Sequence, residues 1–344
     1  MKPRSTPAEG LQLSPTAGAV CGLLAAVGYA LSNAALREAV ETDPILVSAM
    51  KAVPTVIACA PLLVMLSLRG QSWASSWHPL PFLLAGSLAG QLAGNLLFQI
   101  SLGMIGLALS VPICLSVMIV GGALLGKWLL GDRVSHRMMV AMVILVGATF
   151  VLSFGNPTAE MDRGGSFGTT SLGVLASAVS GIAYAFYSVS MRSALRDGFT
   201  VPLTMITSGL VGCCFLWPIA FARLGSTAIA STATDQWWAM VIAGVLNMAA
   251  FFMLSFALRA ITVLSVNLLN ATQTGLAAIL GVYWFGEQVT APLLVGLFLT
   301  IAGLLVLGTG GRGETLKRPQ TDPLKEPIPA APIPAAPGSE QKAS

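Results

Sequence analysis

The sequence predicts an all-α polytopic membrane protein, in which ten transmembrane helices form two inverted repeats of five helices. The first observation behind this prediction is composition: 55% of the residues are hydrophobic, 9% are charged, and the mean hydropathy is +0.80. Soluble domains are about one quarter charged, so the main solvent of this chain is expected to be a bilayer. The other two observations are a series of apolar stretches of about 20 residues, the length that crosses the hydrocarbon core, and an internal repeat.

Proline, glycine and charged residues divide the apolar part of the chain into ten segments of helical length. Lys2 and Arg4 precede the first segment, as basic residues precede the apolar core of a signal peptide. We retain this segment as a helix, because it is longer than such a core and because a similar segment recurs in mid-chain. The expected helices are 15–36, 44–68, 80–102, 107–130, 134–154, 171–192, 200–222, 236–258, 262–285 and 290–310.

The distribution of Lys and Arg predicts which side of the membrane each loop occupies, since basic residues accumulate in cytoplasmic loops. With the N-terminus inside, 14 basic residues fall on the cytoplasmic side and three on the other, while Lys51 lies within a helix. Both termini are therefore expected in the cytoplasm, and the chain is expected to cross a bacterial cytoplasmic (inner) membrane many times. The three basic residues on the opposite side are Arg37, Arg163 and Arg223.

The chain repeats itself at an offset of 155 residues without a gap. Tyr29 recurs as Tyr184, and the segment GDRVS at 131–135 recurs as GEQVT at 286–290. Each half contains five expected helices, an odd number, so the second half must enter the membrane in the opposite orientation. Opposed repeats are a recurring construction of secondary transporters, because exchanging the shapes of the two halves opens a central site to either side in turn.

The repeat also defines the expected domain organisation. We expect a cytoplasmic N-terminal tail, a first repeat, an external linker, a second repeat and a disordered cytoplasmic tail. The last of these is rich in Pro and Ala and cannot bury a core. In that order, their bounds are residues 1–14, 15–154, 155–170, 171–310 and 311–344.

Paired five-helix repeats, each with a G-[DE]-x-V-[ST] step between its fourth and fifth helix, resemble EamA domains. Two tandem EamA domains make up the ten-helix members of the drug/metabolite transporter superfamily, and the resemblance covers residues 15–310. It implies that the first four helices of each half surround a central cavity, with the fifth and tenth helices outside. Members carry many kinds of solute, so the resemblance does not select a substrate. The first half departs slightly, with Asp132 where glutamate is more usual.

Lys51 is the charged residue that lies well inside an expected helix, about 10 Å from its outer end at 1.5 Å per residue. A lysine at mid-membrane costs about 2.5–3.5 kcal/mol, so it is a candidate for function. EamA domains often carry a basic residue in this helix, so the resemblance supports that role; a side chain that snorkels outward is the alternative. No Asp or Glu lies near the middle of an expected helix. An anionic, zwitterionic or neutral polar solute is therefore favoured over a permanent cation, although aromatic faces and carbonyl groups could still hold a cation.

Other polar side chains recur at helical spacing within the apolar segments. Amides and phenols that faced lipid would lack partners, so these side chains are expected to face protein or a wet cavity. Hydrogen bonding between helices, without any contact to a solute, is the alternative. Together with Lys51, the residues expected along the substrate path are Tyr29, Asn33, Gln91, Asn95, Gln99, Tyr184, Ser188, Asn267, Asn270 and Thr274.

Pro112 of the fourth helix occupies the repeat position of Asn267 in the ninth helix. Helix breakers at matching positions of two halves often mark a binding site, because an interrupted helix frees carbonyl groups for a ligand. A simple proline kink is the alternative reading.

The pairs Gly131–Asp132 and Gly286–Glu287 are expected to have an architectural role at the junctions between helices. Thr290, like its repeat partner in the first half, can cap the N-terminus of the helix that follows. The preceding carboxylate is then expected near the positive end of a helix.

The expected function is secondary transport of a small polar metabolite or drug-like solute by alternating access, with export as the favoured direction. No enzyme is expected, since the sequence has no H-E-x-x-H motif, no nucleophile with a plausible base and no buried aspartate pair. No metal, cofactor or nucleic acid is expected either. A lipid-handling translocase or a non-transporting membrane scaffold is the alternative.

The sequence also has no Walker motif, so transport is expected to run on a solute or ion gradient, or passively. The expected partners are therefore a small-molecule solute, the lipid bilayer and, where an ion gradient drives transport, a coupling ion. The protein is expected to be a monomer or a homodimer.

Overall fold

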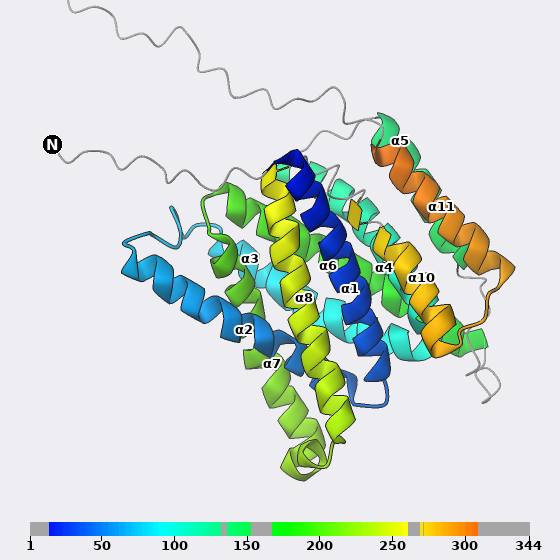
Figure 1. Ribbon diagram of the computed structural model, residues 1–344, viewed down its shortest axis with the longest axis horizontal. Coiled ribbons are helices and arrows are strands. Elements are labelled where there is room, and N and C mark those ends of the chain that lie inside the picture. The colour runs from blue at the N-terminus through cyan, green and yellow to red at the C-terminus, as the bar shows by residue number, and fades with distance from the viewer. Residues whose placement is uncertain (1–13, 132–135, 153–166, 261–268, 271, 309–344) are drawn as a thin grey trace, which may run out of the picture. The chain divides into compact units, whose positions relative to one another are not determined.

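The computed structural model describes residues 14–131, 136–152, 167–260, 269–270 and 272–308, and within these ranges every regular element is a helix (Figure 1). Apart from Ser14, the expected tails at 1–14 and 311–344 lie outside the described residues, as does most of the linker at 155–170. The elements are α1 (Pro15–Glu38), α2 (Pro44–Leu68), α3 (Leu80–Leu88), the π-helix η1 (Ala89–Asn95), α4 (Leu96–Leu130), α5 (His136–Leu152), α6 (Phe167–Arg196), α7 (Val201–Ala230), α8 (Thr234–Ala260), α10 (Thr272–Phe285) and α11 (Ala291–Gly308).

The first two helices begin where the sequence predicts, because local capping groups start them. Ser14 accepts a hydrogen bond from the backbone N–H of Ala17 at 3.1 Å, and a proline follows it at the first helical position. Asp43 accepts from the N–H of Ile45 at 2.8 Å, again with a proline next in the chain. A side-chain acceptor followed by proline satisfies an otherwise free amide and presets the helical backbone.

Helix α6 is longer than predicted. The prediction ended it at 192, but the structure continues it to Arg196. An arginine does not terminate a helix, since it keeps its backbone N–H and has a good helix propensity. The prediction ended α7 at 222, three residues before the break from helical geometry at Gly225, which has φ +76° and ψ 160°; a further helical segment then continues to Ala230.

The predicted third and fourth helices are present as a helical hairpin that turns at Gly106. This glycine has φ +76° and ψ 179°, which interrupts α4. The hydroxyl groups of Ser101 and Ser110 lie 2.8 Å apart across the interruption. Nine residues of a straight helix would separate them by about 13 Å, so the chain folds back on itself at this point.

Six helical stretches in the described part of the chain are long and apolar enough to cross a membrane, and one of them, Leu80–Leu130, contains the hairpin at Gly106. Two shorter apolar helices are Met139–Leu152 and Ala291–Val306. The predicted ninth helix, 262–285, lies partly outside the described residues, which include its second part as α10. The chain is therefore a polytopic, all-helical membrane protein over the described ranges, and the total of ten helices stays a prediction.

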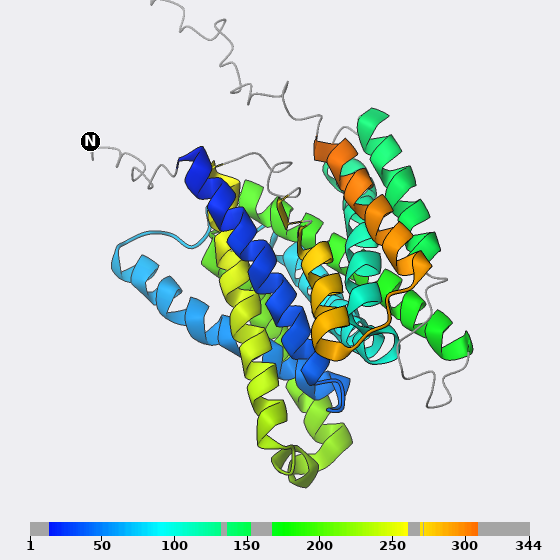
Figure 2. The same cartoon turned by 45° about the vertical axis from the view of Figure 1, so that its right-hand side comes forward.

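Four packing arrangements organise these helices. Helix α1 packs along α8, and α6 packs along α3, η1 and α4. Helix α2 packs on α7, and α5 packs on α11 at one edge of the bundle, as the two views agree (Figures 1 and 2). Each arrangement joins a helix from residues 15–152 to one from residues 167–308, so the two parts of the chain are packed together along their length.

The bundle has two ends that the contacts identify. At one, which we call the Glu287 end, Arg37 near the end of α1 approaches Glu287 in the loop between α10 and α11. At the other, the Phe199 end, the α2–α3 loop meets the α6–α7 loop through backbone hydrogen bonds from Ser75 N–H to Gly198 O and from Thr200 N–H to Trp73 O. Phe199 is buried there in an apolar cluster.

We expect Gly106→Ala to destabilise the protein by about 1–3 kcal/mol, because positive φ with extended ψ is a conformation available essentially to glycine alone. The added Cβ would also collide with the carboxylate of Glu287. Thermal unfolding in detergent measures the effect. The matched control is Gly122→Ala in the same helix, where a new Cβ meets nothing within 4 Å; equal melting temperatures for the two variants would contradict the role given to Gly106.

Candidate functional site

A cavity of about 260 Å³ lies in the middle of the bundle, between helices from both parts of the chain. Its walls come from α1, α2, η1, α4, α6, α7, α8 and α10. Its apolar wall includes Phe98, Met118, Met205, Phe251 and Leu254. Drug-sized pockets are typically about 300–1,000 Å³, so this cavity suits a small solute.

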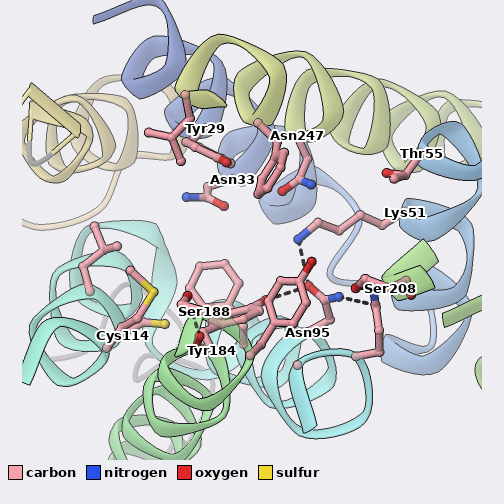
Figure 3. A pocket seen from close by; sticks show the side chains of 18 of the residues that line it. Tyr29, Asn33, Lys51, Thr55, Asn95, Cys114, Tyr184, Ser188, Ser208 and Asn247 are labelled. Carbon is pink, nitrogen blue, oxygen red and sulfur yellow. Dashed lines mark hydrogen bonds between the residues drawn. The ribbon is translucent and has the colours of Figure 1, made fainter. Parts of the chain in front are cut away.

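Lys51 extends from α2 toward the cavity and donates a hydrogen bond from Nζ to Oδ1 of Asn95 at 2.9 Å (Figure 3). The same oxygen accepts a hydrogen bond from the hydroxyl of Tyr184 on α6 at 2.6 Å. Two donors on one oxygen leave the amide nitrogen of Asn95 facing the other way. Its orientation is therefore set by helices from both parts of the chain.

A chain of amides continues from Asn95 to α7. Asn95 donates from Nδ2 to Oε1 of Gln91 at 2.5 Å, and Gln91 donates from Nε2 to Oγ and to the backbone oxygen of Ser208 at 3.0 and 3.1 Å. Gln91 and Asn95 both belong to the π-helix η1. Such wider turns are rare and frequent at functional sites. Here the wider turn accompanies two amides, four residues apart, that bond to each other beside the cavity.

The described lining contains one basic side chain. Among the described residues that line the cavity, Lys51 is the cation, and none is Asp or Glu. Asn33 and Asn247 point into the same space (Figure 3) and have no hydrogen-bond partner among the described residues. The site therefore offers a solute one cation and several neutral polar groups.

Most of the predicted path residues lie together at this cavity, although their contact with a solute stays a prediction. Two predicted residues do not line the cavity. Gln99 is buried and donates from Nε2 to the backbone oxygen of Leu36 at 2.9 Å, and Thr274 is also buried. A third, Asn267, lies outside the described residues. Those that line the cavity are Tyr29, Asn33, Lys51, Gln91, Asn95, Tyr184, Ser188 and Asn270.

The sequence reasoning missed several lining residues. On α10 the cavity is lined by Gln273 and not by its neighbour Thr274. Asn247, on α8, and Ser208, on α7, also line the cavity. A single asparagine in an apolar helix was the available signal for Asn247, since an amide in lipid lacks partners.

The carboxylate of Glu287 lies at the positive end of a helix. It accepts hydrogen bonds from the backbone N–H groups of Leu107 at 2.6 Å and Ala108 at 2.7 Å. These amides begin the second part of α4, directly after the break at Gly106. The carboxylate therefore caps a helix from the other part of the chain, because the fold brings that N-terminus to it. Thr290 does cap α11, by accepting from the N–H of Leu293 at 3.3 Å.

The remaining architectural residues act on the backbone. Gly131 and Gly286 follow α4 and α10 with φ +69° and +65°, the left-handed conformation that ends helices. Asp132 lies outside the described residues. Pro112 is buried within helical backbone, and the interruption of α4 is at Gly106, six residues earlier, so Pro112 does not break the helix.

Arg37 completes the cluster at the Glu287 end. Its Nε lies 3.7 Å from Oε1 of Glu287, and its guanidinium carbon lies 6.0 Å from the centre of the Phe285 ring. Both charged side chains are nearly buried, with 11% and 3% of their surface exposed. A buried apolar cluster that includes Phe98, Leu107 and Val111 separates this ion pair from the cavity.

We expect Asn95→Leu to lower the free energy of unfolding by about 1–3 kcal/mol, because it leaves Lys51, Tyr184 and Gln91 without their shared partner in a buried site. Thermal unfolding in detergent measures this loss. The matched control is Asn247→Leu, which lines the same cavity but has no hydrogen-bond partner among the described residues. A loss of the same size in both variants would contradict the network.

Three comparisons relate this chain to known proteins. Residues 171–309 match the EamA-like transporter family. An uncharacterized transporter of Archaeoglobus fulgidus is 27% identical over 181 residues, which are 52% of this chain and 59% of that relative; the match therefore spans about three-fifths of the relative's length. A crystal structure described only as that of a protein superimposes with a TM-score of 0.56 at 17% identity, over 85% of this chain and 96% of the other. That likeness shows a shared fold.

Proposed function

We propose that this membrane protein, whose residues 171–309 match the EamA-like transporter family, is a secondary transporter that moves a small polar solute by alternating access between two inverted repeats. The observation that carries the proposal is the central cavity, which is lined from both parts of the chain and has a polar network across them. A site shared by two opposed halves can be exposed to either side when the halves exchange their shapes.

The packing of the helices supports the inverted repeat. At the offset of 155 residues, α1 corresponds to α6, and α8 corresponds to the first arm of the hairpin. The contact of α1 with α8 then corresponds to the contact of α6 with α3, η1 and the start of α4. The contacts of α2 with α7 and of α5 with α11 each correspond to themselves. Such an exchange of contacts is expected where two halves are related by a two-fold axis in the membrane plane.

The direction we assign is export from the cytoplasm of a bacterium. Ser188, near the Phe199 end, is exposed and lines the cavity, whereas the apolar cluster at the Glu287 end is buried. Arg192 and Arg196 at the end of α6 lie toward the Phe199 end, as expected of a cytoplasmic face. Access to the cavity past Ser188 would let the solute enter from the cytoplasm.

Two other functions are weaker readings of the same observations. A lipid-handling translocase would need a route for an acyl chain, whereas the lining here is a chain of amides around a cation. A scaffold without transport would have no use for an uncompensated lysine beside a cavity, since a charge within a membrane is costly. An enzyme is not proposed, because the matching family consists of transporters.

Purified protein in liposomes is expected to take up a labelled solute from a panel of amino acids, organic anions, nucleosides and cationic drugs. Unlabelled solute on the far side should accelerate this uptake, because an alternating-access carrier returns faster when loaded. The control is liposomes that contain Gly106→Ala protein of reduced stability. No uptake of any class under imposed pH and voltage steps would favour the scaffold.

The inverted repeat has its own test. Reporter tags in the stretch between α5 and α6 should face the side opposite to the N-terminus, since five helices separate them. Tags on the same side as the N-terminus would contradict the inversion, and with it the proposed mechanism.

A further inference from the structure

We propose that Lys51 binds the carboxylate group of the transported solute, an inference that rests on the proposed function. The solute class is then small organic acids and amino acids that carry a free carboxylate next to an apolar part. The juxtaposition that carries this inference is an ammonium group at a central cavity whose described lining contains no acid.

The ammonium group of Lys51 has a hydrogen-bond partner but no counter-charge. Its partner, Oδ1 of Asn95, belongs to a neutral amide, which orients the cation without neutralising it. Two neighbouring amide oxygens already accept hydrogen bonds: Oδ1 of Asn95 is shared with Tyr184, and Oε1 of Gln91 accepts from Asn95. Burying a cation without an anion costs free energy. An anion that binds beside Lys51 therefore supplies a favourable charge interaction that no described lining residue supplies.

The geometry leaves the carboxylate a defined place. An ammonium group has three donors, and Asn95 takes one of them. Asn33 and Asn247 point into the space that Lys51 faces, and their amide groups have no partner among the described residues (Figure 3). Charge-assisted hydrogen bonds from an ammonium and neutral amide donors suit a carboxylate.

The rest of the solute is expected to lie against the apolar wall. Phe98, Met118, Met205, Phe251 and Leu254 line the same cavity. Its volume of about 260 Å³ is below that of pockets for drug-sized ligands, so a compact metabolite fits better. A permanent cation would meet the ammonium of Lys51 with no acid in the described lining to balance it.

The test compares ligands that differ in charge and little else, with the full chain in detergent. Binding of 4-methylpentanoate and of its amide, 4-methylpentanamide, is measured by thermal stabilisation and calorimetry, alongside leucine and a wider panel of small carboxylates and their amides. Carboxylates should bind about ten- to hundredfold more tightly than the matching amides, as expected when a charged hydrogen bond is lost. Leucine against 4-methylpentanoate separates amino acids from simple organic acids.

The variants link this preference to Lys51. Lys51→Met should remove the difference between acid and amide, whereas Lys51→Arg should retain it. Lys127→Met, which removes an exposed cation from α4, should bind as the natural protein does. Equal affinity for acids and amides in the natural protein would overturn the inference, and this result does not depend on the folding of any variant. Thermal stabilisation by chloride equal to that by the carboxylates would overturn it too.

Failure of this inference is distinguishable from failure of the proposed function. Transport of a cation or a neutral solute, unchanged in Lys51→Met, would leave a transporter with another substrate class. Binding of carboxylates through Lys51, with no uptake into liposomes, would leave the site and remove the transport.

A different observation supports a second inference about the same proposed function: we infer that Glu287 holds the Glu287 end closed. Its carboxylate bonds to two backbone amides of α4 from a position 180 and 179 residues away in the chain, and Arg37 of α1 approaches it at 3.7 Å. One side chain thus joins three segments from both parts of the chain at one end of the cavity.

The surroundings of Glu287 fit a contact that forms and separates. Gly106 and Gly281 flank the carboxylate, and a Cβ on either glycine would collide with it, so the two segments meet closely through glycine alone. Arg37 is buried, yet its Nε and one terminal nitrogen make no hydrogen bond. A charge-assisted cap on a helix N-terminus is strong, and it adds to the buried apolar cluster that Leu107 of α4 shares with Ala277 of α10.

The test measures access to the cavity from each side. The five natural cysteines are replaced, and a single cysteine is placed at Asn33 or at Ser188, both of which line the cavity. With Glu287→Gln, an impermeant thiol reagent should label position 33 from the Glu287 end about tenfold faster or more. Labelling of position 188 from the Phe199 end should become slower, because opening one side closes the other.

The control is Glu38→Gln, which removes a carboxylate at the same end that bonds the indole of Trp284 at 3.1 Å outside the junction. It should leave both labelling rates unchanged. Unchanged rates in Glu287→Gln, or faster labelling at both positions as in general loosening, would overturn the inference. Should Glu287→Gln fail to fold, Arg37→Met is expected to give the same reciprocal change, and its absence counts in the same way. The liposome uptake experiment tests the proposed function independently of these labelling results.

Discussion

Hydrocarbon offers no hydrogen bonds, and this constraint accounts for most of what the structure contains. Each backbone N–H and C=O in the membrane must find a partner within the chain, which helices provide. Side-chain amides are under the same constraint. Gln91, Asn95 and Ser208 form a connected network, and Gln99 donates to the carbonyl of Leu36 near the end of α1. Among the residues that line the cavity, Asn33 and Asn247 have no partner in the described part of the chain, so their amide groups are available to a solute.

The same constraint explains the hairpin of α4. Breaking a helix inside a membrane exposes the first amides of the segment that follows. At Gly106 those amides belong to Leu107 and Ala108, and the carboxylate of Glu287 satisfies both. A tight turn, a helix start and a contact between the two parts of the chain are thus parts of one arrangement. Glycine is needed in it twice, since Gly106 and Gly281 leave the room that the carboxylate occupies.

Lys51 differs from the other described lining groups in its charge. The network around it orients its ammonium group and leaves its charge without a counter-ion among the described lining residues. A protein that needed the network for packing alone could have used a neutral side chain there, at lower cost. An anion bound beside Lys51 would offset that cost. The proposed alternating access is consistent with the position of Lys51 at a cavity lined from both parts of the chain.

The sequence by itself determined the elements and their likeness to one another. Helices α1 and α2 begin where capping residues and prolines predict. The repeated motif marks Gly131 and Gly286, which have left-handed backbone conformations. The charge of Lys51 within an apolar segment marks it as a candidate for function. These features depend on neighbours in the chain, which spacing and composition report.

Only the tertiary structure decided which polar face meets which partner. Helical spacing placed Gln99 and Thr274 on the path, but Gln99 bonds to α1 and Thr274 is buried, while Asn247 and Gln273 line the cavity. Glu287 was expected near the positive end of a helix, and the helix that it caps begins 180 residues earlier in the chain. The physical reason is that a hydrogen bond depends on the approach of two groups in space, and segments so far apart in the chain are brought together by packing, which no local pattern records.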